Sequence, residues 1–421
     1  MRPPLDRRDF LKRSAGAASL FAAGNMAPPV HARGSATIKI GLIGCGGRGT
    51  GAAANCVASA PGVELVAMGD LFPDRLKESF DTLSKELGAA FQVAPERAFS
   101  GFDAYAQVIA SDVDLVLLAT PPHFRPLHLE AAVRAKKHVF MEKPVATDPT
   151  GVRSVLASSQ LAKEHGLAIV AGTQRRHQAS YLETMRRIHD GAIGAIVAGQ
   201  CWWNQGGLWG RMREPGWSDM EWQVRNWLYF TWLSGDHICE QHIHNLDVMN
   251  WALRAHPLQA TGMGGREVRT GPEYGNIYDH FSIEYEYPGG VLIQSSCRQI
   301  ANTAGRVAER VVGTGGVADP NGTIQGAHAF RFDADAQPCD PYVQEHADLI
   351  ASIRAGTPLN EGAQVAESTL TAIMGRMSTY TGKTVTWEQA LNSTLDLAPP
   401  AYDFGELAIE PVAVPGVTKL T

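Results

Sequence analysis

The chain has 421 residues, of which 37 are basic and 43 acidic, and its formal net charge is −6. A chain of this length predicts two domains, because a single hydrophobic core stops growing at about 250–300 residues. The small acidic excess offers no basic surface for nucleic acid or an anionic membrane, so we expect a small-molecule partner and no nucleic acid.

Residues 1–35 are predicted to be a twin-arginine signal peptide with its linker. The run RRDFLK at 7–12 precedes a weakly apolar stretch at 15–23, and the run VHA at 30–32 suits a signal peptidase. A disordered basic tail is the alternative. The apolar stretch is too short to span a bilayer, and no later stretch qualifies as a membrane helix. We therefore expect an exported, periplasmic protein.

Residues 36–172 alternate short apolar runs with helical stretches, a pattern that predicts βαβ units and a parallel sheet. The expected strands are 38–43, 63–68, 113–119, 138–141 and 167–170. The expected helices are 52–59, 74–87, 126–135 and 152–165. Ligands of such sheets lie beyond the carboxyl ends of the strands, where turns fall at 44–49, 120–122 and 142–144.

The first of these turns carries a G-x-G-x-x-G motif directly after the first expected strand. Gly44 permits a tight turn, Gly46 lets the backbone approach a pyrophosphate, and Gly49 lets the helix pack closely on the sheet. The start of the helix supplies free N–H groups for the phosphates. Asp70 ends the second strand, where a carboxylate accepts hydrogen bonds from both ribose hydroxyls and disfavours a 2′-phosphate. The motif therefore predicts NAD as the cofactor, in preference to NADP.

Lys143 lies in the third turn, Glu142-Lys143-Pro144, at the cofactor edge of the sheet. A cation there can bind a sugar hydroxyl and stabilise the alkoxide that develops before hydride leaves. A solvated surface lysine is the alternative. The predicted cofactor-binding residues are Gly44, Gly46, Gly47, Arg48, Gly49, Asp70, Thr120, Pro121, His123, Glu142 and Lys143.

After residue 172 the pattern changes to that of a second domain. Residues 281–287 alternate strictly between apolar and polar side chains, as a strand does when one face is packed and the other is wet. Weaker strands are expected at 195–202, 259–263, 291–296 and 310–313, and helices at 342–354 and 364–380. We predict a substrate-binding and oligomerisation domain at 173–395, built on an open, mainly antiparallel sheet, and an extended tail at 396–421.

Eight of the nine tryptophans fall between residues 201 and 251. Their flat apolar faces and polar edges suit carbohydrate rings, although a tryptophan-rich loop that seals a domain contact would have the same composition. The predicted substrate-binding residues are Arg176, Trp203, Asn226, Trp227, His242 and Asp247.

The same segment gathers ionisable groups in the run GDHICEQHIHNLD at 235–247. Glu240 and His244 are four residues apart and are expected to share one helical face, so that the carboxylate orients the imidazole. An imidazole can accept the proton that a sugar hydroxyl loses together with hydride. Lys143, His244 and Glu240 are thus the predicted catalytic group. The alternatives are a buried core histidine or a metal site with His237, but the spacing matches neither H-E-x-x-H nor H-x-x-E-H, and we predict no metal.

The glycine motif, the run ATPP at 119–122, the run EKP at 142–144 and the E-x-x-x-H helix together resemble the Gfo/Idh/MocA oxidoreductases over residues 36–395. The resemblance implies an α/β fold, with a Rossmann domain followed by an α/β domain on an open antiparallel sheet. It implies catalytic roles for Lys143 and His244, with Glu240 in the place of the usual aspartate. It also implies a homo-oligomer, a cis peptide in the EKP turn, and, as in several exported relatives, a tightly held nicotinamide.

The leading functional hypothesis is an exported NAD-dependent oxidoreductase that acts on a hydroxyl of a sugar, a sugar derivative or a cyclitol. The second is a glycosidase in which NAD oxidises C3 transiently and elimination cleaves the glycosidic bond. The third is a sugar or cofactor sensor that keeps the fold without catalysis.

Overall fold

The structure is a computed structural model that describes residues 37–336 and 339–421. The predicted signal peptide and its linker, at 1–35, lie outside the described residues. In the described part of the chain, no helix combines the length and the apolar character needed to cross a bilayer.

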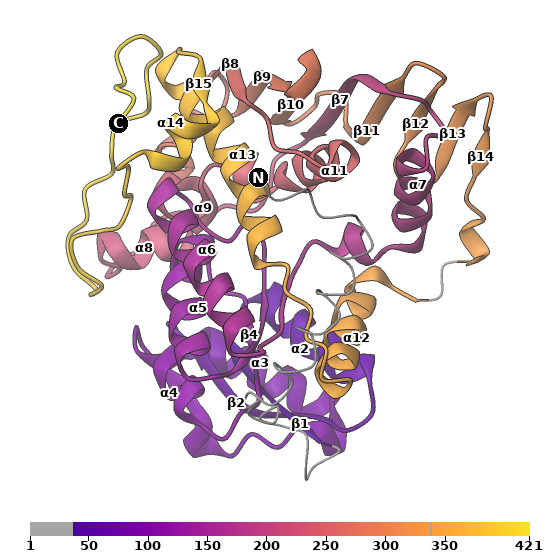
Figure 1. The fold of residues 1–421 in the computed structure, drawn as a ribbon. Coiled ribbons are helices and arrows are strands. Elements are labelled where there is room, and N and C mark those ends of the chain that lie inside the picture. The colour runs from indigo at the N-terminus through magenta and orange to yellow at the C-terminus, as the bar shows by residue number, and fades with distance from the viewer. Residues whose placement is uncertain (1–36, 337–338) are drawn as a thin grey trace, which may run out of the picture. The chain divides into compact units, whose positions relative to one another are not determined.

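The first domain is built on a six-stranded parallel sheet with the order β3-β2-β1-β4-β5-β6, in the lower half of Figure 1. This is the strand order of a Rossmann fold, as the sequence predicts. Its strands are β1 (Ile38–Ile43), β2 (Val63–Asp70), β3 (Ala98–Ser100), β4 (Leu115–Leu118), β5 (His138–Met141) and β6 (Ile169–Ala171). Its helices are α2 (Gly47–Ser59), α3 (Pro73–Glu86), α4 (Ala104–Ala110), α5 (Arg125–Arg134) and α6 (Pro149–Glu164).

Two elements of this domain were not expected from the sequence. Strand β3 has three residues and helix α4 has seven, so both are too short to show a clear periodicity. The expected helix at 52–59 also begins earlier, at Gly47, because the helix includes the second half of the glycine motif. This earlier start places the helix N-terminus in the turn that is predicted to bind phosphates.

The second domain is built on a nine-stranded sheet with the order β14-β13-β12-β11-β7-β10-β9-β8-β15. Only the pairing of β7 with β10 is parallel among the described strands of this sheet, so the sheet is mainly antiparallel, as predicted. Its strands are β7 (Ile196–Gln205), β8 (Gln259–Gly265), β9 (His280–Tyr287), β10 (Val291–Gln299), β11 (Arg306–Gly313), β12 (Gly316–Asp319), β13 (Thr323–Gly326), β14 (Phe330–Arg331) and β15 (Val385–Thr386).

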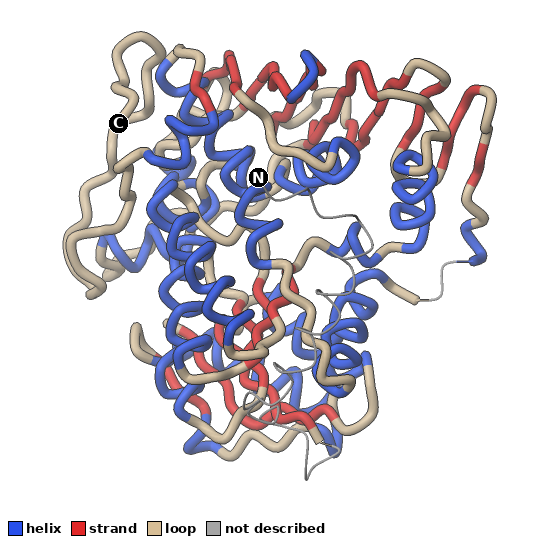
Figure 2. The backbone as a smooth tube through the Cα atoms, in the orientation of Figure 1, coloured by secondary structure: helices blue, strands red, loops and turns tan. Residues whose placement is uncertain are grey.

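Helices cover one face of this sheet, on the side of the first domain in Figure 2. The helices of this part are α7 (Ala179–His189), α8 (Asp219–Arg225), α9 (Thr231–Ser234), α10 (His237–Glu240), α11 (Ile243–Leu253), α12 (Pro341–Arg354), α13 (Gly362–Thr381) and α14 (Trp387–Asn392). The strands alternate accordingly, since Ile293 of β10 is buried while Leu292 beside it is exposed. Val197 and Met263 are likewise exposed on their strands.

The chain returns to the first domain after the second sheet. Leu349 and Ile350 of α12 belong to the same hydrophobic core as Ile40 of β1 and Ala52 of α2. The long helix α13 packs against α6 of the first domain and β8 of the second sheet. Helices α12 and α13 therefore join the two domains by continuous packing. The domain boundaries at 172 and 395 stay a prediction.

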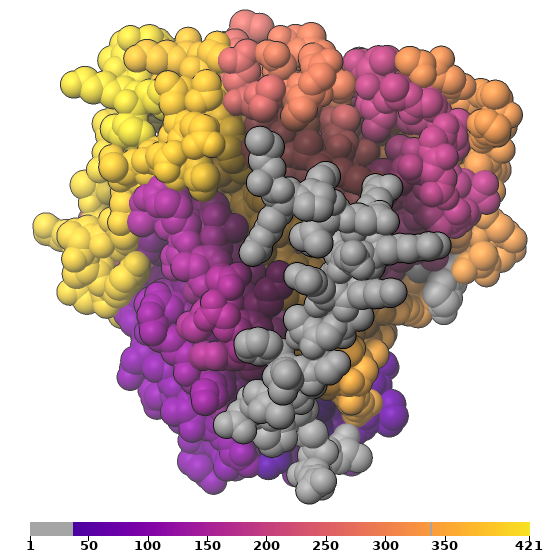
Figure 3. Space-filling view, in the orientation of Figure 1, coloured from indigo at the N-terminus to yellow at the C-terminus, as the bar shows by residue number. Residues whose placement is uncertain are grey.

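The predicted tail is extended and largely exposed, but hydrogen bonds attach it to both domains. Leu397 N donates to Asp148 Oδ2 over 2.9 Å, and the Tyr402 hydroxyl lies 2.8 Å from His123 Nε2, both on the first domain. Leu407 N donates to Asp219 Oδ2 of α8 over 3.1 Å. Figure 3 shows the tail in yellow along the left edge of the view, against the purple surface of the first domain.

Candidate active site

The glycine motif forms a turn that leaves the first turn of α2 open to a ligand. A Cβ on Gly44, whose φ is +98°, would lie 2.5 Å from Thr120 N, and a Cβ on Gly49 would lie 1.8 Å from Gly44 O. Both positions therefore need glycine for the chain to pack. Gly46 caps α2 without a side-chain hydrogen bond, so the N–H groups of the first turn remain available. This arrangement fits a dinucleotide pyrophosphate.

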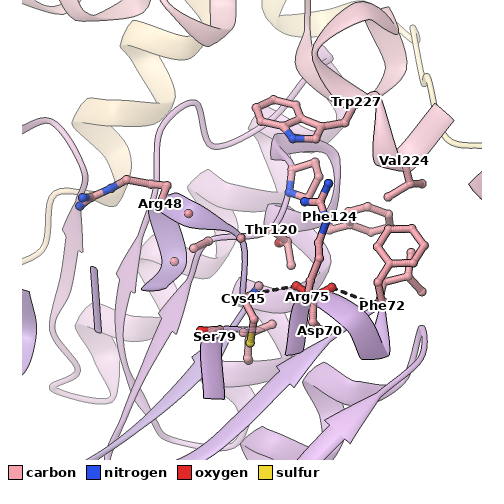
Figure 4. Close-up of a pocket in the computed structure, with 18 of the residues that line it drawn as sticks. Cys45, Arg48, Asp70, Phe72, Arg75, Ser79, Thr120, Phe124, Val224 and Trp227 are labelled. Carbon is pink, nitrogen blue, oxygen red and sulfur yellow. Dashed lines mark hydrogen bonds between the residues drawn. The ribbon is translucent and has the colours of Figure 1, made fainter. Parts of the chain in front are cut away.

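Asp70 ends β2 beside this turn, as Figure 4 shows. Its Oδ2 accepts a hydrogen bond from Cys45 N over 2.6 Å, and its Oδ1 accepts one from Phe72 N over 2.8 Å. Burial raises the pKa of Asp70, and the two backbone N–H groups oppose that rise. Each carboxylate oxygen keeps a further acceptor site, so Asp70 can still bind ribose hydroxyls.

The turn and Asp70 open into a pocket of about 840 Å³. This volume lies within the usual range of ligand sites, about 300–1,000 Å³. Thr120 and Pro121 line the pocket, as predicted for cofactor-binding residues. At the other end it is lined by Trp227, Glu240 and Gln241 of the second domain. A ligand in this pocket would contact both domains.

Three predicted cofactor-binding side chains are engaged elsewhere. The Arg48 guanidinium forms an ion pair with Glu142 and lies 3.4 Å from Glu345 Oε1 of α12, and in Figure 4 its side chain points away from the pocket. His123 contacts the tail through the Tyr402 hydroxyl, and burial lowers the pKa of His123 to about 4. Arg48 and Glu142 thus connect the glycine turn to α12, and His123 anchors the tail.

Lys143 emerges at the carboxyl end of β5, in a turn whose Lys143–Pro144 peptide is cis, as the resemblance implies. Its Nζ donates a hydrogen bond to the main-chain carbonyl of Glu240 and lies 3.4 Å from Glu240 Oε1. The side chains of Lys143 and Glu240 are only 11% and 10% exposed. The structure therefore holds the predicted lysine and glutamate together in a mostly buried ion pair between the two domains.

Glu240 and His244 do not share one helical face, contrary to the expectation from their spacing. Helix α10 ends at Glu240, and α11 begins at Ile243 after a break at Gln241 and His242. The four-residue spacing misleads here because the interruption redirects the chain. Glu240 faces Lys143, whereas His244 stacks on Trp203 with ring centroids 5.7 Å apart.

The His244 imidazole is buried among positive charges. Burial lowers the pKa of His244 well below its usual value, and the charges of Lys143, Arg175 and Arg48 lower it further. The ring is therefore neutral near pH 7. Among the described residues, His244 Nδ1 and Glu240 Oε2 are buried polar atoms without a hydrogen-bond partner. A ligand could complete these two atoms, although other described residues away from this site, such as His346, also have buried polar atoms without a partner.

Of the predicted substrate-binding residues, Trp203 and Trp227 lie at this site, and four others hold the scaffold. Arg176 forms a bidentate ion pair with Asp247 over 2.8 and 2.9 Å. His242 is fully buried, with Nε2 2.7 Å from Ser295 Oγ, and burial lowers the pKa of His242 to about 3. Asn226 is also fully buried, and its Oδ1 accepts a hydrogen bond from Arg211 N over 2.8 Å.

The side chains considered for a metal do not converge. His237 lies 3.2 Å from Asp236 Oδ1 and its ring contacts Phe281, whereas Glu240 pairs with Lys143 and His244 stacks on Trp203. Over residues 37–336 and 339–421, no three His, Cys, Asp or Glu side chains form a group that could hold a metal ion. The six cysteines are free thiols.

Residues 38–173 match the oxidoreductase family with an NAD-binding Rossmann fold, and residues 181–319 match the GFO/IDH/MocA C-terminal domain. The chain belongs to the Gfo/Idh/MocA oxidoreductase family.

Relatives of this Gfo/Idh/MocA oxidoreductase carry several different names. The chain is 28% identical to an inositol 2-dehydrogenase from Rubrobacter xylanophilus over 286 residues, which cover 67% of this chain and 71% of that protein. It is 30% identical to a 2,7-anhydro-N-acetylneuraminate hydratase from Escherichia coli over 190 residues, which cover 44% of this chain but only 46% of the hydratase. An aldose-aldose oxidoreductase from Caulobacter crescentus, crystallised with glycerol, has the same fold, with a TM-score of 0.66 at 20% identity over 83% of this chain and 99% of that one.

Several residues at the site of this Gfo/Idh/MocA oxidoreductase escaped the sequence analysis. Arg75 of α3 and Arg211 of the loop after β7 line the pocket together with Trp209. Arg175 forms an ion pair with Glu309 of β11 and lies over the Trp203 ring, 5.7 Å from its centroid. These residues come from four distant segments without a local motif, and only the fold brings them to the site.

Proposed function

We propose that the protein is an exported, NAD-dependent oxidoreductase that transfers hydride between a CH–OH group and a tightly bound nicotinamide. The substrate class is a sugar, a sugar derivative or a cyclitol. The observation that carries the proposal is the Lys143–Glu240 ion pair, in which Glu240 lines the dinucleotide pocket, with the buried His244 close enough to feel the charge of Lys143. Family membership supports it.

In this proposal the protein side chains remove the proton of the reacting hydroxyl and stabilise the charge that remains on its oxygen. The Lys143 ammonium binds the reacting hydroxyl and stabilises negative charge on its oxygen. Glu240 fixes the ammonium through its main-chain carbonyl and side chain. His244, kept neutral by burial and by adjacent cations, accepts the hydroxyl proton. Trp203 keeps the imidazole flat against its ring.

The nicotinamide, when bound, supplies the acceptor for hydride. The N–H groups at the start of α2 would hold its pyrophosphate, and Asp70 would bind a ribose. We propose NAD in preference to NADP because a buried carboxylate at the ribose end disfavours an additional phosphate. Export by the twin-arginine route would favour a cofactor that remains bound, because the periplasm offers no nicotinamide pool to replace it.

The test is reduction of the bound cofactor by a panel of sugars, sugar acids and inositols, followed at the NADH absorbance band. We expect at least one member to reduce it in wild-type protein, and we expect Lys143→Ala to lose that reduction while retaining the nucleotide. Equal responses of the two proteins would contradict the role of Lys143. Tight nucleotide binding without reduction by any substrate would favour a sensor.

A redox-neutral reaction on a sugar is the second candidate, favoured by the name of the related hydratase. In this version C3 of a glycoside is oxidised transiently by NAD, which acidifies the C2 proton. Loss of that proton eliminates the aglycone, water adds to the resulting double bond, and the hydride returns to C3. Release of free sugar without net accumulation of NADH would support it over the first candidate.

We also propose a homo-oligomer that forms through the uncovered face of the nine-stranded sheet. Val197, Met263 and Leu292 expose apolar side chains there. They lie among polar neighbours such as Glu284 and Gln294, and many subunit interfaces have a mixed composition of this kind. Sedimentation velocity of wild-type protein and Leu292→Glu would test it, with dissociation expected in the variant and identical profiles contradicting the proposed face.

A further inference from the structure

Two arginines from different domains reach the dinucleotide pocket. Arg75 belongs to α3 of the first domain, and in Figure 4 its side chain rises from above Asp70 into the pocket. Arg211 belongs to the loop between β7 and α8 of the second domain and lines the same pocket. Burial lowers the pKa of Arg75, the negative charge of Asp70 raises it, and the positive charge of Arg211 lowers it.

Neither side chain has a carboxylate partner within the described residues, although acids are nearby. Asp74 and Glu221 are bound by Arg225, over 2.9 Å in both cases, and both oxygens of Asp70 accept backbone N–H groups. Within the described part of the chain, Arg75 makes a long hydrogen bond of 3.4 Å to the Arg225 carbonyl, and its guanidinium lies over the Phe72 ring, 5.8 Å from the centroid. Two cations in one pocket whose neighbouring acids are already engaged elsewhere favour an anion as a further partner.

The position of Arg75 indicates which anion this is. Its Nη1 lies 3.6 Å from the point where a Cβ on Gly46 would be, so the guanidinium lies over the glycine turn. The pyrophosphate of a dinucleotide approaches the backbone at this middle glycine. The ribose, by contrast, is expected at Asp70.

Arg211 is fixed from behind by buried side chains. Its main-chain N–H donates to Asn226 Oδ1 over 2.8 Å, and its carbonyl accepts a hydrogen bond from Trp222 Nε1 over 3.0 Å. The loop therefore fixes the main chain of Arg211 at the pocket, while its side chain is exposed. This contact gives Asn226 an indirect role at the site.

We propose that Arg75 and Arg211 form a diphosphate-binding pair, one arginine from each domain, that closes over the dinucleotide. The inference rests on the proposed dinucleotide cofactor and adds to it a reason for slow release. Two guanidinium groups on one diphosphate link α3 to the loop before α8. The nucleotide can then leave only when both contacts break.

The experiment measures binding of NADH and NADPH to nucleotide-free protein by fluorescence, in the absence of any sugar. We expect Arg75→Gln and Arg211→Gln each to weaken both nucleotides equally, by about tenfold or more, since each removes a charge-assisted hydrogen bond. The NADH dissociation rate should rise in parallel, and more steeply in the double variant. Arg75→Lys should recover part of the affinity.

Arg213→Gln is the matched control, because Arg213 lies on the same loop but pairs with Asp219 over 2.7 Å. The nucleotide affinity of Arg213→Gln should equal that of wild-type protein. Melting temperatures are measured for every variant to check that it folds. Loss of affinity for NADPH alone would overturn the diphosphate assignment in favour of a 2′-phosphate site. Unchanged affinities would overturn the pair itself.

The outcomes also separate this inference from the proposed function. Wild-type protein that binds neither nucleotide would overturn both. Suppose instead that wild-type protein binds NADH through the two arginines, but no sugar or cyclitol reduces NAD bound to it. This result would support the pair and contradict the proposed reaction.

Discussion

At the scale of single residues, the environment of His244 decides what the site can do. Three cations disfavour a protonated ring. They are Lys143 in the turn after β5, Arg175 in the 3₁₀ turn Gln174–His177, and Arg48 in helix α2. Arg175 is itself held by Glu309, which also accepts a hydrogen bond from the Tyr181 hydroxyl over 3.1 Å. Burial and the neighbouring positive charges therefore keep the His244 imidazole neutral.

This environment predicts the pH dependence of turnover. Because the pKa of His244 lies well below its ordinary value of 6.5, the acid limb of kcat/KM for oxidation of a hydroxyl should also lie well below pH 6.5. Arg175→Gln removes one cation and should move this limb to higher pH. Arg175→Lys keeps the charge and should leave it in place. Identical profiles for the two variants would show that Arg175 does not influence His244 through its charge.

At the scale of elements, the break between α10 and α11 shapes the part of the pocket that Glu240 and Gln241 line. It turns the Glu240 carbonyl and side chain toward Lys143 and places Gln241 in the pocket lining. An uninterrupted helix would have put Glu240 and His244 on one face, as their spacing suggests. The sequence gives no glycine or proline signal at this break, so only the tertiary contacts reveal it.

The tail is the second element that contributes to the pocket. Phe404 stacks on Phe72 with ring centroids 5.9 Å apart, and its centroid lies 5.2 Å from that of Phe102. Phe72 and Phe102 both line the dinucleotide pocket. Beyond these rings, the Leu407 carbonyl accepts a hydrogen bond from Gln223 of α8 over 2.8 Å. The tail therefore supports the pocket wall from outside and connects it to the second domain.

Removing aromatic rings of the tail should loosen the wall of the dinucleotide pocket. Each aromatic contact contributes about 0.5–1.5 kcal/mol beyond its buried area, so a Tyr402→Ala, Phe404→Ala variant should release NADH several-fold faster than wild-type protein. Stopped-flow fluorescence measures this rate. Val417→Ala is the control, because Val417 is also in the tail but is 74% exposed. Equal release rates for the two variants would mean that the tail does not support the pocket.

At the scale of the whole molecule, local patterns predicted the first domain well and the joints between domains poorly. The bounds of β1 and β5 and the glycine motif follow from short-range signals, and so does the position of Lys143 at a strand end. The packing of α12 against α2 and the ion pairs of Arg48 and Arg175 join residues that are far apart in the sequence. Arg176, His242 and Asp247 were assigned to substrate because buried and ligand-facing polar residues look alike in a sequence.

The contacts of His177 with residues of α12 and of the segment before α13 predict how the stability of the fold depends on pH. Burial opposes a charge on His177, but Asp348 of α12 and Glu361 before α13, at 2.6 and 3.2 Å, outweigh it and raise the pKa of His177 to about 10. Because the unfolded value is near 6.5, this stabilisation is complete below pH 6.5 and declines as the pH rises toward about 10.

The comparison is between melting temperatures of wild-type protein and His177→Gln across that range. The variant should be less stable at pH 6, and the difference between the two proteins should shrink steadily toward pH 10. A difference that stays constant with pH would show that the charge on His177 does not stabilise the joint.

The most direct measurement of the central claim is a crystal structure of the protein with NAD. The account predicts the pyrophosphate on the N–H groups of α2, a ribose at Asp70, and the nicotinamide facing Lys143 and His244 at the other end of the pocket. A nicotinamide that lies away from these two side chains, or a pocket that stays empty at saturating NAD, would contradict it.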